Sequence, residues 1–339
     1  MRLAAAAAAA ALVLAAASLP AAPASAAAAE PPPGPPWASP LAADHPLAGT
    51  FWSTATGERL SPEQVVDRAV DSRVLLLGER HDNADHHALQ AWLTRSVIAA
   101  GRRPAVVYEM METDEQPRID AWRRSDPPPA DAAGLGDALD WETSGWPAWS
   151  LYAPMAEAAL TAGLPILAGN LPLETVRSLA RQGAGSLPPD LAERLVLAAD
   201  DAPEVQEGLI ADVRAGHCDL MPDAMLAPMA LVQRGRDAMM AAVVVEGLAD
   251  PATDMAILIA GNGHVREDRG VPLRLEALEV PRDHMLTVGP LEVRDGAVAI
   301  TDYLPPDSLP PYDIVWFSPR ADDVDHCAAL RERMKNKNH

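Results

Sequence analysis

Lysine is almost absent from this sequence: its only two lysines, Lys335 and Lys337, lie within the last five residues. The formal net charge is −21 at pH 7. An acidic surface repels phosphate backbones and anionic headgroups, which argues against nucleic acid or anionic lipid as partners. The same charge is compatible with a cationic ligand or a metal ion, although solubility alone also explains such a composition.

Cysteine is just as scarce, with Cys218 and Cys327 as the only two. Neither lies near the N-terminus, which argues against lipid attachment there. In an oxidising compartment the two thiols could pair. Their wide separation in the sequence leaves both the paired and the free state open, because pairing requires Cα atoms that lie close in space.

No apolar run reaches the roughly 20 residues that a membrane-spanning helix needs. The longest opens the chain: after Met1-Arg2, residues 3–17 are mostly Ala and Leu, and small residues fill 21–29. A charged start, an apolar middle and a small-residue end are typical of a secretory signal peptide. We therefore expect cleavage near Ala26 and a location in the periplasm or cell envelope, with secretion as a further option.

Composition divides the rest of the chain. Residues 27–57 are rich in proline and alanine and predict a tether with little order. The predicted organisation is a signal peptide over 1–26, the tether over 27–57, an α/β domain over 58–327 and a C-terminal tail over 328–339.

Short apolar runs alternate with helical segments along the domain. Strands are predicted at 73–78, 104–108, 164–168 and 255–260, with weaker ones at 285–288 and 314–317. Such alternation predicts an α/β fold with a mainly parallel sheet covered by helices on both faces. The long helical segment at about 186–250 is then an insertion between the third and fourth strands.

Ionisable residues follow these strands. Glu79 and His81 come after the first strand, Glu109 ends the second, and His264 follows the fourth. Because the carboxyl ends of parallel strands meet at one edge of a sheet, we expect the four side chains to converge. Carboxylate and imidazole groups suit a divalent transition metal or a general acid–base pair. The alternative is a set of helix caps and turn residues.

A second pattern lies in the helical insertion, where one histidine and three methionines are spaced by four: His217, Met221, Met225 and Met229. On one continuous helix they would form a soft apolar stripe with an imidazole at its end. Imidazole or thioether can ligate haem iron. Ordinary core packing is the competing interpretation.

Two common catalytic motifs are missing. No serine or cysteine elbow is present, which argues against a covalent acyl-enzyme. No Gly-x-Gly-x-x-Gly follows the first strand, which argues against a dehydrogenase.

Several segments, in order, resemble the ChaN family. They are Leu-Leu-Leu-Gly-Glu-Arg-His-Asp-Asn at 75–83, Tyr-Glu-Met at 108–110, Leu-Ala-Gly-Asn-Leu at 167–171, Gly-His-Cys at 216–218, and the segments 233–240, 259–272 and 312–317. This resemblance implies haem binding in the envelope, linked to iron or haem uptake. The wider Tiki superfamily, with its metalloproteases and erythromycin esterases, shares the elements found here at Glu79, His81, Glu109 and His264.

Two functions follow from these patterns. One is a haem-binding protein with His217, Met221, Met225 and Met229 at its cofactor site. The other is a metal-dependent hydrolase of peptide or ester bonds, with Glu79, His81, Glu109 and His264 as catalytic residues and ligands of a divalent metal ion. A homodimer and partners among envelope uptake components are compatible with either.

Overall fold

A single eight-stranded sheet organises residues 30–195, 201–304 and 311–337, the part of the chain that the computed structural model describes. The strands are β1 (Phe51–Ser53), β2 (Arg59–Leu60), β3 (Val74–Leu77), β4 (Pro104–Glu112), β5 (Ile166–Asn170), β6 (Met255–Ile259), β7 (Met285–Glu292) and β8 (Ile314–Ser318). Their order is β2-β1-β8-β7-β3-β6-β4-β5. Neighbours from β8 to β5 run parallel, whereas β1 pairs antiparallel with both β2 and β8.

The central strands are buried on both faces. All four residues of β3 are apolar and buried, as expected for a parallel strand between two helical layers. Leu75 and Leu77 face one apolar core with α1, α2 and α5, while Val74 and Leu76 face the other with α6, α9 and α10. The predicted fold class, a mainly parallel sheet covered by helices on both faces, is confirmed.

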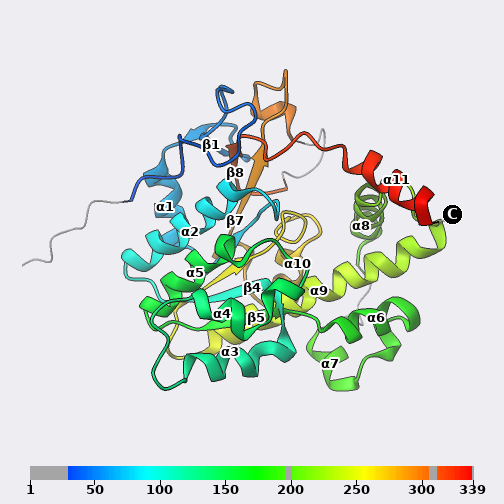
Figure 1. The fold of residues 1–339 in the computed structure, drawn as a ribbon, viewed down its shortest axis with the longest axis horizontal. Coiled ribbons are helices and arrows are strands. Elements are labelled where there is room, and N and C mark those ends of the chain that lie inside the picture. Colours follow the sequence, from blue (N-terminus) through cyan, green and yellow to red (C-terminus); the bar gives the residue numbers. More distant parts are fainter. Residues whose placement is uncertain (1–29, 196–200, 305–310, 338–339) are drawn as a thin grey trace, which may run out of the picture.

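Eleven α-helices surround the sheet within the described residues (Figure 1). They are α1 (Pro62–Asp71), α2 (Ala84–Ala99), α3 (Gln116–Arg123), α4 (Ala133–Ala138), α5 (Trp149–Thr161), α6 (Leu173–Gln182), α7 (Pro189–Arg194), α8 (Pro203–Gly216), α9 (Asp223–Ala249), α10 (Val271–Ala277) and α11 (His326–Lys337).

The helical insertion comprises α6 to α9, between β5 and β6, and so begins before the predicted residue 186. The C-terminal half of α9 packs on the sheet through Met240 and Val244, which are fully buried. Its N-terminal half extends away from the sheet beside α8 (Figure 1). None of the helices in the described ranges is both long and apolar enough to cross a membrane.

The prediction of a poorly ordered tether is wrong for residues 30–57, the part of it that the structure describes. Phe51 is buried against Trp316 and pairs with it across β1 and β8. The carboxylate of Asp85 accepts hydrogen bonds from the backbone N–H groups of Ala38 and Ser39. The burial of Phe51 and the hydrogen bonds to Asp85 hold this segment against the rest of the domain despite its proline content. The predicted tail forms most of α11, and the predicted signal peptide lies outside the described residues.

Candidate functional site

The four residues predicted at the strand ends come together in the structure. Glu79 follows β3, Glu109 lies near the end of β4, and His264 follows β6, and these three strands are adjacent. The N–H of Gly261 donates to Glu109 Oε2 at 2.7 Å. A Cβ on Gly261 would lie 2.9 Å from His81 Cε1, so a glycine at this position lets the loop after β6 approach His81 closely.

One half is centred on Glu79, whose side chain is 0% exposed. Its Oε1 lies 2.7 Å from His81 Nδ1 and accepts a hydrogen bond from the hydroxyl of Tyr152 at 3.1 Å. Its Oε2 lies 3.1 Å from Nδ1 of His87, which is also buried. The ring of Trp146 stands edge-on to His81, with centroids 4.9 Å apart. A buried carboxylate is therefore surrounded by three groups able to donate to it.

His81 is the solvent-facing member of this half, with a side chain 39% exposed. Burial alone would lower the pKa of His81. The hydrogen bond to Glu79 and the charges of Glu109 and Glu79 outweigh that effect and raise the pKa of His81 above its usual range. His81 is thus the group in the cluster best placed to exchange a proton with a ligand or with water.

The other half places His264 between two buried carboxylates. Its Nε2 lies 3.1 Å from Glu109 Oε1, and its Nδ1 lies 2.5 Å from Asp237 Oδ1. Burial alone would lower the pKa of His264, but the charges of Glu109 and Asp237 and their hydrogen bonds raise it to about 10. Burial would raise the pKa of Glu109, but His264 lowers it to about 2. The ring is therefore an imidazolium that donates from both nitrogens.

The loop after β6 closes on itself to present His264. The N–H of Val271 donates to the carbonyl of His264 at 2.7 Å, and that of Gly270 donates to Arg266 O at 2.9 Å. A Cβ on Gly270 would collide with the His264 carbonyl oxygen. Glycine is required here by the close approach of two backbone segments.

Three of these partners were not predicted from the sequence: Asp237, Tyr152 and Gln233. Asp237 and Gln233 lie on α9 within segment 233–240, which had been matched only as part of a family resemblance. The available signal was the position of Asp237 directly before the apolar run 238–245 of α9, because a charge at the edge of a buried segment needs a partner. Tyr152 had no such signal. His87, in the first turn of α2, is also buried against Glu79.

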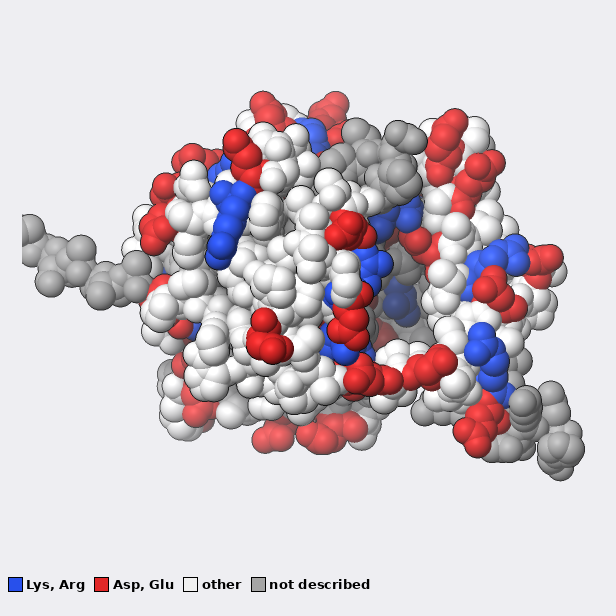
Figure 2. Space-filling view, turned by 90° about the horizontal axis from the view of Figure 1, so that it is seen from above, with Lys and Arg blue, Asp and Glu red and all other residues white. Residues whose placement is uncertain are grey.

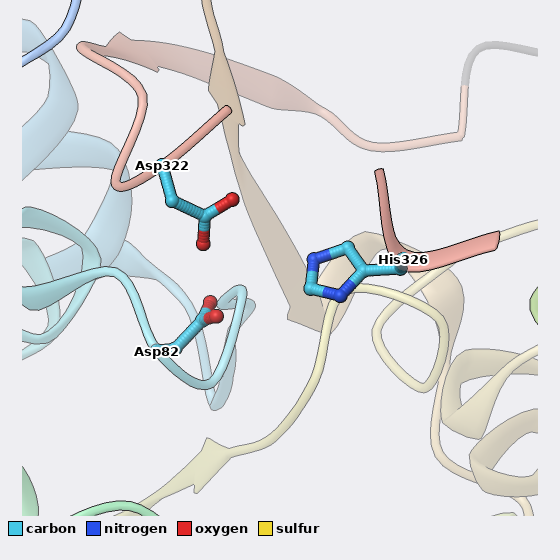
Figure 3. A group of neighbouring side chains, drawn as sticks. All are labelled: Asp82, Asp322 and His326. Atoms are coloured by element: carbon cyan, nitrogen blue, oxygen red, sulfur yellow. The ribbon is translucent and has the colours of Figure 1, made fainter. Parts of the chain in front are cut away.

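Metal binding at Glu79, His81, Glu109 and His264 stays a prediction. Their ligand atoms already bind one another, and an imidazolium has no lone pair to offer a metal. Among the described residues, one group of three has ligand atoms all within 4.8 Å: Asp82, Asp322 and His326 (Figure 3). The guanidinium of Arg80 lies against this group, with Nη2 2.7 Å from Asp322 Oδ2 and 3.2 Å from His326 Nε2. The group is therefore already paired with a cation of the chain.

A cavity of about 430 Å³ lies beside the cluster, between α8, α9 and the loop after β6. Its lining combines apolar, amide, imidazole, guanidinium, phenol and carboxylate groups: Val176, Leu209, Asp212, Val213, Gly216, His217, Met229, Val232, Gln233, Arg236, Gly263, Arg266 and Tyr312. Its one carboxylate, that of Asp212, is paired with Arg269. Figure 2 shows the molecule hollowed between its larger body and the part that carries α8 and α11, with basic side chains inside the hollow. Gln233 also contacts His264 through its amide nitrogen, 3.0 Å from Nδ1. The cavity and the cluster thus share a wall.

The predicted stripe of one histidine and three methionines does not exist as one helical face. His217 caps the end of α8, Met221 lies in the turn, and Met225 and Met229 belong to α9. Positive φ angles at Cys218 and Asp219 and a proline before α9 break the helix. His217 and Met229 line the cavity, whereas Met225 is 43% exposed.

The imidazole of His217 is held in a definite orientation. Its Nδ1 lies 2.7 Å from the carbonyl oxygen of Val213, to which it donates. This hydrogen bond places the proton on Nδ1 and leaves the lone pair on Nε2, the arrangement that metal-ligating histidines adopt. The lone pair of His217 Nε2 is therefore available to a hydrogen-bond donor or to a metal ion.

A family model described as haem-binding uptake, Tiki superfamily, ChaN, matches residues 65–275. Among solved structures, "Cofacial heme binding to ChaN of Campylobacter jejuni" has a TM-score of 0.61 and 21% identity, covering 78% of this chain and 95% of that one. At this identity the likeness shows the fold alone. A mutant erythromycin esterase in its open conformation has a TM-score of 0.41 and 16% identity, covering 74% of this chain and 81% of that one.

A curated protein from Arabidopsis thaliana, RETICULATA-RELATED 5, chloroplastic, is 22% identical over 247 residues. The match covers 67% of this chain but 32% of that protein, so the chain spans about a third of its relative's length.

Proposed function

Because the chain belongs to the ChaN family of haem-binding uptake proteins in the Tiki superfamily, we propose that it binds haem in the cavity between α8, α9 and the loop after β6. The observation that carries the proposal is the combination of an oriented imidazole, His217, with an apolar wall and an arginine in one cavity. When bound, haem would supply an iron that an imidazole nitrogen can hold.

The lining meets the three needs of a haem site. Haem gains most of its affinity from burial of its apolar ring, and Leu209, Met229 and Val232 offer apolar surface for it. His217 Nε2 offers an axial ligand. The propionates need cationic partners, and Arg236 lines the cavity with a buried Nε that has no hydrogen-bond partner among the described residues.

Arginines outside the cavity are already engaged. Arg214, a further candidate for the propionates, pairs with Asp223 at 2.9 Å, and Arg234 lies 3.3 Å from Asp201. Arg266 lines the cavity but makes a bidentate pair with Asp268. Arg236 is therefore the arginine that we assign to a propionate.

The strand-end cluster is less suited to the haem ring. Glu79, Glu109 and His264 are buried, Glu79 is paired with His81 and Glu109 with His264, and the surface they would offer is polar. The alternative function, a metal-dependent hydrolase, would need at least three ligand atoms around an open point. Within the described ranges these four residues do not provide such a set. Haem binding in the neighbouring cavity is the function that the geometry supports best.

Replacing His217 with alanine should weaken haemin binding about tenfold or more, equal to at least about 1.4 kcal/mol, and shift the Soret band. The measurement is a haemin titration of the mature protein followed by absorbance. Glu109→Gln keeps an acceptor for the Gly261 N–H and should leave haemin affinity nearly unchanged.

Two methionines of α9 provide a matched control. Met229→Ala should weaken haemin binding because Met229 lines the cavity, whereas Met225→Ala should not, because Met225 faces solvent. If Glu109→Gln abolished haemin binding and His217→Ala did not affect it, haem would bind at the strand-end cluster instead.

We further propose that the protein is exported to the periplasm or cell envelope and serves iron or haem uptake there. The N-terminal pattern of the sequence supports export, and so does a disulfide between Cys218 and Cys327, because such bonds persist in oxidising compartments. N-terminal sequencing of the protein from an envelope fraction should find a start near residue 27. An intact Met1 in that fraction would contradict the proposal.

A further inference from the structure

Residues 319–327, here called the C-terminal strap, connect the end of β8 to the helical insertion. The strap begins at the sheet, where the carbonyl of Pro319 accepts a hydrogen bond from Asn83 Nδ2 at 3.2 Å, and the N–H of Ala321 donates to Glu292 at 2.8 Å. It ends at Cys327, in the first turn of α11, above α8 (Figure 1). The strap therefore joins the sheet beside the strand-end cluster to the end of α8, which lines the cavity.

Arg80 anchors the strap to the strand-end cluster. It stands between Glu79 and His81 in the sequence, and its side chain reaches Asp322 at 2.7 Å, Glu292 at 2.6 Å and His326 at 3.2 Å. Figure 3 shows the carboxylates of Asp82 and Asp322 and the ring of His326 turned toward a common point. The guanidinium of Arg80 therefore accounts for the close approach of Asp82, Asp322 and His326.

The disulfide anchors the other end of the strap to the turn that carries His217. Cys327 follows His326 directly, and its sulfur is bonded to that of Cys218, the residue after His217. Cys218 and Asp219 both have φ of 57°, in the left-handed region, which aspartate tolerates but a cysteine rarely adopts. The turn is thus held in a conformation that its own sequence does not favour.

We propose that the Cys218–Cys327 disulfide and Arg80 together position His217 over the cavity, so that haem affinity depends on the oxidised state of these two cysteines. The proposal rests on haem binding at His217. Reduction by a dithiol breaks the S–S bond, transfers two electrons and two protons to give two thiols, and leaves the reductant as its own disulfide. The turn then relaxes, and His217 loses its fixed position. Cys327 is partly exposed, so a reductant can reach it.

The test compares the oxidised wild type with Cys218→Ser/Cys327→Ser in haemin titrations and in haem transfer to excess apomyoglobin. Serine is used because free thiols would themselves ligate haem iron. We expect about tenfold weaker binding and faster haem loss in the double variant. The Soret band should shift as in His217→Ala. Arg80→Gln should show a smaller effect of the same kind. The control is Arg320→Gln, which removes an arginine of the strap itself that pairs with Asp295 and Asp323; it should change neither the haemin affinity nor the rate of haem loss.

A double-mutant cycle separates positioning from general stabilisation. If the disulfide acts through His217, its removal should cost nothing further in the His217→Ala background. Additive losses, wild-type affinity in the serine variant, or a loss of secondary structure in that variant by circular dichroism would each overturn the proposal. Unfolding would do so because the disulfide would then hold the domain together rather than position one turn. If the oxidised wild type binds no haemin, or if His217→Ala has no effect, the proposed function fails instead.

Discussion

Replacing His264 with alanine should lower the free energy of unfolding by about 3–5 kcal/mol, measured by urea denaturation at pH 6. The imidazolium lies 3.1 Å from Glu109 and 2.5 Å from Asp237, and all three side chains are buried. Its removal leaves two carboxylates without their counter-charge in a place that water does not reach. The cost of such unpaired buried charges exceeds that of the small void left by the ring.

The same substitution at His81 is the matched control and should cost about 1 kcal/mol. His81 is partly exposed, and Glu79 keeps its contacts with Tyr152 and His87 when His81 is gone. Adding Asp237→Asn to His264→Ala should recover part of the loss, because one buried charge disappears. Equal costs at His81 and His264 would show that the buried ion pairs do not dominate the stability of this site.

Much of the fold could be predicted from the sequence because the central strands are apolar throughout. Continuous apolar runs such as Val74–Leu77 mark strands buried on both faces, and parallel order follows from the helices between them. The antiparallel strand β1 escaped prediction. It has three residues in a proline-rich region, and its pairing with β8 depends on residues more than 260 positions later, which no local pattern reveals.

The convergence of Glu79, His81, Glu109 and His264 could be predicted because topology alone brings the carboxyl ends of parallel strands together. Their partners could not. Asp237 reaches His264 from a helix of the insertion, and the position of that helix depends on tertiary packing. The spacing of His217 with three methionines was misleading for a related reason: periodicity assumes a continuous helix, and Pro222 with two left-handed residues ends it.

Stability should also depend on pH through His264, in a direction that follows from its pKa. In the folded protein this pKa is raised to about 10, against a usual value of 6.5. The unfolded chain gives up its proton near pH 6.5, whereas the folded protein holds it until about pH 10. The stabilisation is therefore fully present below pH 6.5 and declines as the pH rises toward 10, by at most about 1.4 kcal/mol per pH unit.

The difference in the free energy of unfolding between the wild type and His264→Ala isolates this effect, because the variant lacks the titrating ring. We expect the difference to be largest between about pH 5 and 6.5 and to shrink steadily up to pH 10, measured by urea denaturation across that range. At lower pH the stability also depends on Glu109, whose pKa is lowered to about 2. The stabilisation that Glu109 contributes is present above pH 4.5 and is lost as the pH falls toward 2. Asp237 also faces the ring; burial raises the pKa of this carboxyl, although the charge of His264 opposes the shift. A difference that stays constant from pH 6 to pH 10 would mean that His264 is neutral between its two carboxylates, and the ion-pair description of this half of the site would be wrong.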